Sequence, residues 1–217
     1  MQFFYCTFAG ITYLSPRPPS GSYHSQYGQD YYIEKLGLVE NGGFFVEVGC
    51  NHPVKDSNTN FLETVMNCSG VSIDAIDFSK EFQELRPKTK FLRLLVSDVI
   101  KISDFFHVLN ADMMSSINKE ALQQGIGYET RIEKIRTTPM SQIECALRPI
   151  DILFVDVEGA EFSVLKSVDW NIQSPKVICI ENNGLYFPRA ELVSYLVDKG
   201  YRHRARLGFS DDIFVKI

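Results

Sequence analysis

No CxxC pair occurs among the five cysteines of this 217-residue sequence, and their spacing is wide. The odd number and the wide spacing favour reduced thiols of a cytosolic protein over a disulfide framework. Long apolar runs are missing as well, because none approaches the roughly 20 residues that cross a membrane. The apolar start of the chain lacks the basic flank of a signal peptide. We therefore expect a cytoplasmic protein with no membrane partner.

Basic residues are also too few to indicate a nucleic-acid surface. The chain has 22 Lys and Arg against 27 Asp and Glu, which gives a net charge of -5. A protein that binds nucleic acid neutralises phosphates with clustered Lys and Arg. We expect no nucleic-acid partner, and the composition says nothing about the oligomeric state.

Proline, glycine and serine gather in one place only, residues 15–22. This predicts an N-terminal arm and linker over 1–24 and one domain over 25–217. Within the domain, apolar runs that read as strands alternate with patterns that read as helices. The predicted strands are 43–50, 71–76, 91–97, 151–157 and 176–181, the predicted helices are 25–36, 57–67 and 79–85 with further helices after the fourth and fifth strands, and 203–207 and 212–216 form a terminal hairpin.

This alternation indicates an α/β protein with a Rossmann-like fold. The mostly parallel seven-stranded sheet ends in a C-terminal antiparallel hairpin, and helices cover both faces. Ligands of such sheets bind beyond the carboxyl ends of the strands. The residues that follow each strand are therefore the candidates for function.

Acidic residues predominate at these strand ends. A pyrophosphate cofactor requires a glycine-rich turn, but only Gly49 follows the first strand, so the GxGxxG pattern of dinucleotide binding is absent. S-adenosylmethionine carries a ribose diol, an ammonium and a sulfonium, and it has no phosphate. A crevice rich in acidic residues favours this ligand over a pyrophosphate cofactor. The acidic residues of the predicted crevice are Glu47, Asp74, Asp98, Asp156 and Glu181.

Each of these positions also has a purely structural interpretation. Asp74 suits a ribose diol, whereas Asp77 suits a helix cap. Asp98 either holds an adenine amino group or lies in a solvated turn. Gly49 either lets a ligand approach the backbone or serves a turn. His52 is a base candidate by its usual pKa, although a loop histidine without a role is the simpler interpretation.

Four motifs occur in a recognisable order along the chain. They are SQYGQD at 25–30, GFFVEVG at 43–49, SNT with FLE at 57–63, and DVEGAE at 156–161, with TTPMSQI at 137–143 before the fourth strand. In this order the chain resembles the FkbM-type methyltransferases from about Ser25 to its end. Two positions depart from that pattern, because Asn51 replaces a second loop glycine and Asp74-Ala75 replaces Glu-Pro.

The resemblance implies methylation of a hydroxyl oxygen with S-adenosylmethionine as the cofactor. The acceptor is expected to be a sugar or another small-molecule or natural-product alcohol, including a glycan. Asp156 and Glu158 are the implied catalytic residues, and Asp156 lies near the transferred methyl. The implied cofactor-binding residues are Gln29, Asp30, Glu47, Gly49, Asn51, Ser57, Asn58, Asp74, Ala75, Ser97, Asp98 and Asp156.

Three alternatives stay open at this point. Asp156, Glu181 and Asn182 resemble the magnesium ligands of catechol-type O-methyltransferases, although FkbM-like proteins are not expected to need a metal, so none is predicted. A non-catalytic protein that binds S-adenosylmethionine is a second alternative, and an NAD-binding oxidoreductase is a third. The long segment 101–136, which contains Asp112-Met113-Met114-Ser115-Ser116, is expected to shape the acceptor pocket.

Overall fold

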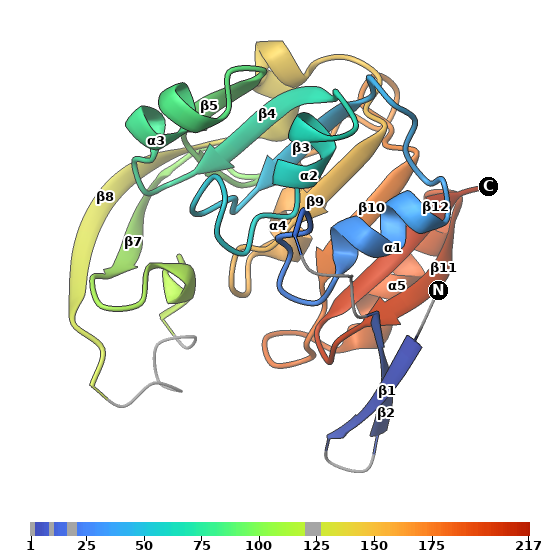
Figure 1. The fold of residues 1–217 in the computed structure, drawn as a ribbon. Helices are drawn as coiled ribbons and strands as arrows, with labels where there is room; N and C mark the ends of the chain where they lie inside the picture. Colours follow the sequence, from blue (N-terminus) through green and yellow to red (C-terminus); the bar gives the residue numbers. More distant parts are fainter. Residues whose placement is uncertain (1–2, 9–10, 17–20, 120–126) are drawn as a thin grey trace.

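Nine strands form one sheet in the computed structural model, which describes residues 3–8, 11–16, 21–119 and 127–217. Neighbouring strands follow the order β1-β2-β11-β12-β10-β9-β3-β4-β5 (Figure 1). Their bounds are β1 Phe3–Phe8, β2 Ile11–Pro16, β3 Phe44–Val48, β4 Ser69–Asp74, β5 Thr89–Arg93, β9 Ile152–Val155, β10 Val177–Glu181, β11 Tyr201–Leu207 and β12 Asp211–Lys216.

Seven of these strands, from β11 to β5, make the predicted sheet. β3 pairs in parallel with both β4 and β9, β4 pairs with β5, and β10 pairs with β9. β12 runs antiparallel to both β10 and β11, so the C-terminal hairpin is confirmed. Every residue of β3 and β9 is buried, which explains the continuous apolar runs of a sheet covered on both faces.

Helices cover the two faces of the sheet and create two cores. α1 (Gln29–Lys35) and α2 (Asn60–Thr64) pack on one face, and α4 (Glu161–Lys166) and α5 (Arg189–Asp198) pack on the other. Because side chains alternate along a strand, β3 sends Phe45 towards α1 and α2, while Val46 and Val48 face α4 and α5. α3 (Ser79–Leu85) lies beside β5, where Phe82 stacks on Phe91.

A second, three-stranded sheet follows β5, and it corrects the predicted third strand at 91–97. β5 ends at Arg93, and β6 (Leu95–Val96) pairs instead with β8 (Thr130–Thr138), which pairs with β7 (Ile102–Val108). The apolar run continues through the break because Leu95 and Val96 are buried as well. The short helices η1 (Asp112–Met114), η3 (Met140–Gln142) and η4 (Glu144–Ala146) complete the described elements.

Two predicted helices are shorter than expected. α1 begins at Gln29 rather than at residue 25, because Asp30 accepts hydrogen bonds from the backbone N–H groups of His24 and Ser25 and holds them in a turn. α2 begins at Asn60 rather than at residue 57. Ser57 still stabilises the start of α2, because its Oγ accepts a hydrogen bond from the Asn60 N–H at 3.1 Å.

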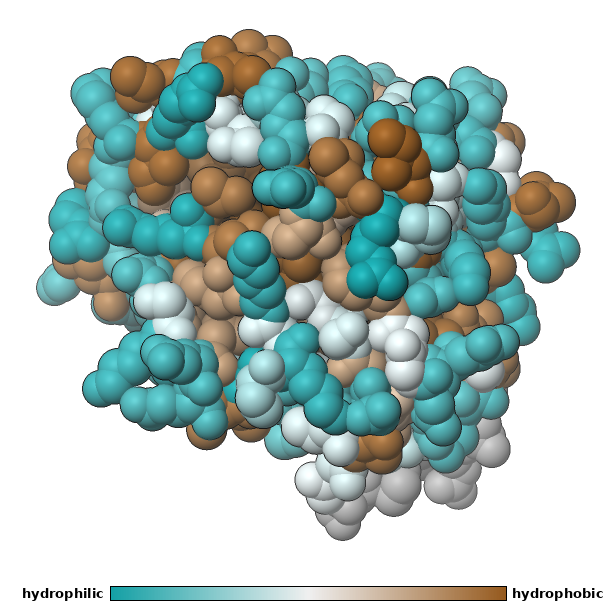
Figure 2. Space-filling model, turned by 90° about the horizontal axis from the view of Figure 1, so that it is seen from above, coloured by the Kyte–Doolittle hydropathy of each residue, from teal (hydrophilic) through white to brown (hydrophobic). Residues whose placement is uncertain are grey.

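The N-terminal arm extends the sheet at its edge. β1 and β2 form an antiparallel hairpin, and Leu14 of β2 pairs in parallel with Leu207 of β11. The hairpin and the three-stranded sheet lie at opposite ends of the molecule (Figure 1). On the face seen from above in Figure 1, apolar side chains show between hydrophilic ones (Figure 2). Within the described residues, no helix has the length and apolarity needed to cross a membrane.

Candidate active site

A cavity of about 1030 Å³ opens beyond the carboxyl ends of β3, β4, β9 and β10, as expected for a parallel sheet. Pockets for single drug-sized ligands span roughly 300–1,000 Å³, so this cavity has room for two ligands at once. Its wall combines the strand ends with three loops. These loops are 49–58, 109–117 and 183–186.

Gly49 shapes the first of these loops, although for a reason that differs from the sequence interpretation. A Cβ on Gly49 would lie 1.6 Å from the carbonyl oxygen of Asp156, and its φ is +82°. The glycine therefore allows the end of β9 to approach β3, rather than a ligand to approach the backbone. Beyond it, Asp74 accepts hydrogen bonds from the N–H groups of Asn51 at 2.8 Å and Ile76 at 2.9 Å.

A buried cation holds the rest of this loop. Arg86 is fully buried and pairs with Glu63 at 2.8 Å. Its guanidinium also donates to the Pro53 carbonyl at 2.8 Å and to the Thr59 hydroxyl at 3.0 Å. All five guanidinium donors of an arginine can act in such a network. Arg86 thus holds the loop 49–58 at Pro53 and at Thr59, which directly follows the loop.

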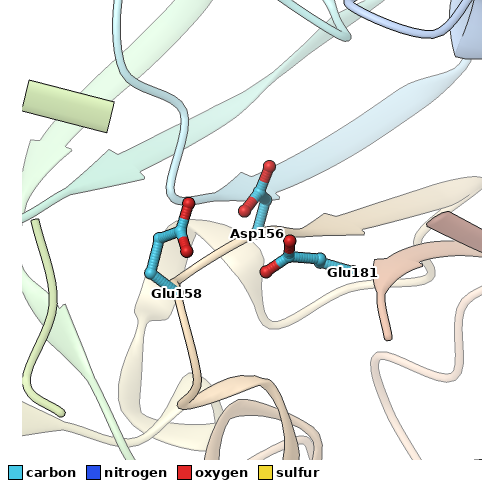
Figure 3. Close-up of side chains that lie close together, drawn as sticks. All are labelled: Asp156, Glu158 and Glu181. Atoms are coloured by element: carbon cyan, nitrogen blue, oxygen red, sulfur yellow. The ribbon is translucent and has the colours of Figure 1, made fainter. Parts of the chain in front are cut away.

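Three carboxylates meet at the centre of the cavity (Figure 3). Asp156 follows β9, Glu158 lies two residues further on, and Glu181 ends β10. One oxygen of each lies within 4.8 Å of the others, and each side chain is partly exposed to the cavity. Parallel neighbouring strands bring the three groups together, because β9 and β10 end at the same edge.

The crowding of these acids raises their pKa values. Burial, followed by the charges of Glu181 and Asp211, raises the pKa of Asp156 well above its usual range. Burial and then the charge of Asp156 raise the pKa of Glu158 to about 8. Burial and then the charge of Glu158 raise the pKa of Glu181 to about 9. At neutral pH the ligand-free cluster therefore holds protons that a cation would displace.

A strained turn aims Glu158 into the cavity. Glu158 has a φ of +52° and Gly159 a φ of +100°, both in the left-handed region. The Ser116 hydroxyl holds this turn by donating to the Glu158 carbonyl at 2.6 Å. The ring of Tyr186 packs against Gly159, where an added Cβ would lie 2.7 Å from a ring carbon. Such strain is typical of functional positions.

The predicted site residues divide into two groups. Those that line the cavity are Gly49, Asn51, Asn58, Asp74, Ala75, Asp156, Glu158 and Glu181. Those that do not line it are Gln29, Asp30, Glu47, Ser57, Ser97, Asp98 and Asn182. The residues of the second group therefore do not form the cavity wall. Most of them make hydrogen bonds within the protein that position the surrounding segments.

Glu47 shows how a framework residue differs from a wall residue. Its carboxylate turns towards α2, where it accepts hydrogen bonds from the hydroxyls of Thr59 at 2.7 Å and Ser72 at 3.1 Å. Burial outweighs these bonds and raises its pKa to about 7. The prediction that five acids face one crevice is therefore wrong for Glu47, which does not line the cavity. It is also wrong for Asp98, which is exposed and bonds to Ser163 beside β6.

Gln29 and Asn182 are framework residues as well. Gln29 accepts a hydrogen bond from the Tyr27 N–H at 2.8 Å and donates to Asp211, which brings Tyr27 to the wall. Asn182 is fully buried and donates to Asp212 at 2.8 Å. Asn182 does not line the cavity, and the carboxyl oxygen that lies beside those of Asp156 and Glu181 belongs to Glu158.

Aromatic residues that the sequence analysis did not select as site residues also line the cavity. Tyr27, Tyr186 and Phe209 line the cavity. Tyr27 belongs to the SQYGQD motif, whereas Tyr186 and Phe209 lie outside the predicted strand ends and the motifs. The predicted segment 112–116 does line the cavity. His52 also lines it, and its Nδ1 accepts hydrogen bonds from the backbone N–H groups of Val54 and Lys55.

The raised pKa values predict that the ligand-free protein becomes less stable as the pH rises. The pKa of Glu158 rises from 4.5 to about 8 on folding, and that of Glu181 from 4.5 to about 9. Between these limits the folded chain binds more protons than the unfolded chain, so the free energy of unfolding falls with increasing pH. Thermal unfolding between about pH 5 and pH 9 should show a steadily falling midpoint.

Two variants make this test specific. Glu181→Gln removes one of the raised carboxyls and should flatten the pH dependence. Asp104→Asn removes a carboxyl that is 48% exposed and should leave the dependence unchanged. A midpoint that stays level or rises over this range in the unaltered protein would contradict the electrostatic description of the cluster.

Comparison with known proteins adds a family to this geometry. Residues 47–203 match the family model described as Methyltransferase FkbM domain. No curated protein matches the sequence. Two solved structures are similar in fold at a low level. The first is described as a ribosomal RNA methyltransferase of Plasmodium falciparum, with a TM-score of 0.46 and 13% identity over 89% of this chain and 97% of that chain.

The second structure is the tRNA (uracil-54, C5)-methyltransferase of Pyrococcus abyssi in complex with S-adenosyl-L-homocysteine. It has a TM-score of 0.43 and 10% identity over 99% of this chain and 44% of that chain. Both similarities are too low to support an argument about the acceptor. The family match covers most of the chain and includes the loop after β3, the acidic cluster and β10.

Proposed function

Because the chain belongs to the FkbM methyltransferase family, we propose that it methylates a hydroxyl oxygen of a sugar or another small-molecule alcohol. The cofactor of this methyltransferase is S-adenosylmethionine. One observation carries the proposal of a hydroxyl acceptor. Asp156 lies on the cavity wall beside Glu158 and Glu181, where its carboxyl group can receive the proton of an acceptor hydroxyl.

The residues present fit the cofactor. Asn58 lines the cavity with a buried Oδ1 that has no hydrogen-bond partner among the described residues, which suits a ligand donor such as an ammonium. Asp74 lies at the end of β4, where a ribose diol would be held. Ala75, Phe78 and Leu95 provide an apolar surface beside it for an adenine ring. We propose that these residues hold S-adenosylmethionine together with Asn51 and Asp156.

The cofactor supplies a methyl group on a sulfonium, which is already a good leaving group. The protein must then align the acceptor and receive its proton. Asp156 is fixed by β9, and its backbone N–H donates to the Val48 carbonyl at 3.0 Å. We propose Asp156 as the general base and Glu158 as a second carboxylate that can take the proton. No metal ion is part of this proposal.

Asp74 gives a direct test of the cofactor position. If its carboxylate grips the ribose diol, Asp74→Ala should weaken binding of S-adenosylhomocysteine by about 1.5–3 kcal/mol, the range for hydrogen bonds to a charged group. The substitution also frees the Asn51 N–H, so both effects act in the same direction. Isothermal calorimetry on folded variant protein provides the measurement.

Asp77→Ala is the matched control for this test. Asp77 lies three residues further along the chain, and its carboxylate accepts a hydrogen bond from the Ser79 N–H at 3.0 Å instead of facing the cavity. We expect this variant to bind the cofactor product normally. If Asp77→Ala weakens binding and Asp74→Ala does not, the ribose is held elsewhere.

Oxygen as the methylated atom can be tested without knowing the acceptor. The protein is incubated with S-adenosylmethionine carrying an isotope-labelled methyl group and with a metabolite extract. The NMR shift of the labelled methyl in the product then distinguishes an ether from an amine or a carbon-bound methyl. We expect a methyl ether. A product methylated on nitrogen or carbon would refute the proposed hydroxyl acceptor while leaving methyl transfer intact.

A further inference from the structure

Glu181 is a half-buried carboxyl group that the proposed reaction leaves unused. Its Oε1 accepts a hydrogen bond from the Asn183 side chain at 3.0 Å. Its Oε2 is buried, and no hydrogen bond reaches it from the described residues. A buried carboxylate oxygen without a donor costs free energy unless a ligand supplies one. The side chain lines the cavity, so a ligand can reach it.

Aromatic rings surround the same part of the cavity. The rings of Tyr27 and Phe209 meet edge to face with centroids 5.3 Å apart. Burial, then the charges of Asp211 and Glu181, raise the pKa of Tyr27 to about 12. Burial, then the charges of Glu158 and Glu181, raise the pKa of Tyr186. Both phenols thus lie within the field of Glu181 and keep their protons. Aromatic faces attract cations, most strongly where water is excluded.

Three exposed apolar side chains line the cavity. Leu185 is 60% exposed, Phe209 49% and Met113 46%, and all three line the cavity. The register of Glu181 with Asp211 places the turn that carries Phe209 beside the end of β10, and Leu185 follows in the next loop. Exposed apolar side chains gathered at a cavity indicate an apolar ligand surface.

The cavity wall offers an anion almost no cationic partner. Among the described lining residues, Lys55 is the single lysine and no arginine is present, whereas Asp56, Asp74, Asp112, Asp156, Glu158 and Glu181 are acidic. A phosphate or carboxylate on the acceptor would find no arginine among these residues to bind it with paired donors. The proposed cofactor brings one ammonium, one sulfonium and one carboxylate of its own, so acidic groups remain in excess of cations.

We propose that the acceptor is an amphiphilic alcohol that also carries a protonated amine, with its ammonium received by Glu181 between Tyr27 and Tyr186 and its apolar body on Leu185, Phe209 and Met113. This inference rests on the proposed function, because it concerns the acceptor side of the same cavity. It excludes neutral sugars and nucleotides as the preferred acceptors.

Three probes that share a phenol ring and a hydroxyl but differ in charge test this proposal. They are tyramine, which is a cation, tyrosol, which is neutral, and para-hydroxyphenylacetate, which is an anion. Each is titrated calorimetrically into the full chain saturated with S-adenosylhomocysteine. We expect tyramine to bind at least about tenfold more tightly than tyrosol, equivalent to about 1.4 kcal/mol, and the anion to bind most weakly.

Two variants assign the preference to residues. Glu181→Gln should abolish the advantage of tyramine over tyrosol. Asp112→Asn removes a carboxylate of the same cavity that is already paired with His107 at 3.1 Å, so it should preserve the advantage. The comparison of probes on the unaltered protein stands even where a variant fails to fold.

Each outcome separates the two proposals. Equal binding of tyramine and tyrosol, or no binding of any probe at millimolar concentrations, overturns the amine-bearing acceptor while saturation with S-adenosylhomocysteine still supports the proposed function. Failure of S-adenosylhomocysteine itself to bind overturns the proposed function. A preference for para-hydroxyphenylacetate overturns the charge argument.

Discussion

Asp156→Asn is expected to slow methyl transfer on the order of 10²–10⁴-fold, the usual contribution of a positioned general base. The substitution keeps the shape of the side chain but removes the charge that takes the hydroxyl proton. The backbone around it is fixed by hydrogen bonds that do not involve the side chain. The melting temperature should therefore change little. The measurement is turnover with the acceptor that the labelling experiment identifies.

A structural role for Asp156 would give the opposite result. If Asp156 capped the turn into α4, the Asp156→Asn protein would lose about 1 kcal/mol of its free energy of unfolding and would keep nearly normal turnover. The structure assigns that role to Glu161, whose carboxylate accepts hydrogen bonds from the N–H groups of Val157 at 3.1 Å and Gly159 at 2.9 Å. Glu161→Ala, which removes the accepting oxygen, is therefore the variant expected to lose stability. Normal turnover in Asp156→Asn would remove Asp156 from the chemistry.

Arg86→Met is expected to destabilise the protein by about 3–5 kcal/mol, because it leaves the carboxylate of Glu63 buried without its partner. Arg86 and Glu63 are 0% and 3% exposed, so solvent cannot replace the lost contact. The substitution also frees the Pro53 carbonyl and the Thr59 hydroxyl, which border the loop of the cavity. Urea unfolding of the purified variant measures the loss.

Lys134→Met provides the control for Arg86→Met. Lys134 pairs with Asp104 at 2.9 Å, but the two side chains are 76% and 48% exposed. Exposed pairs contribute about 0–1 kcal/mol, so this variant should unfold almost as the unaltered protein does. The double variant Arg86→Met with Glu63→Met should recover part of the loss, since no unpaired charge remains. A loss below about 1 kcal/mol in Arg86→Met would contradict the role of the buried pair.

The central strands could be predicted because burial on both faces leaves a continuous apolar run. Phe44–Val48, Ile152–Val155 and Val177–Glu181 all lie within the predicted ranges. The convergence of Asp156 with Glu181 followed from the same pattern, since both residues end parallel neighbouring strands. Local pattern and parallel topology were sufficient for these features.

The break after Arg93 could not be predicted from its own residues. Leu95 and Val96 stay apolar and buried, but their pairing partners Thr137 and Thr138 lie about forty residues away in the sequence. The same limit hid the role of Arg86, whose partners come from a loop and from α2. Only the folded chain shows that this arginine lies inside.

The orientation of strand-end acids was the other feature beyond reach. Alternation along β3 places Glu47 on the opposite face from Val46 and Val48, but the sequence does not say which face leads to the cavity. Glu158 is the converse case. Its position depends on a left-handed backbone that Ser116 and Tyr186 hold from distant loops.

Calorimetric titration of the full chain with S-adenosylhomocysteine tests the central claim most directly. The claim is that the cavity beyond β3, β4 and β9 holds the cofactor of a methyltransferase. We expect saturable binding with a dissociation constant in the micromolar range, or roughly 8 kcal/mol, together with a raised melting temperature. Absence of heat and of thermal stabilisation at millimolar S-adenosylhomocysteine would contradict the claim.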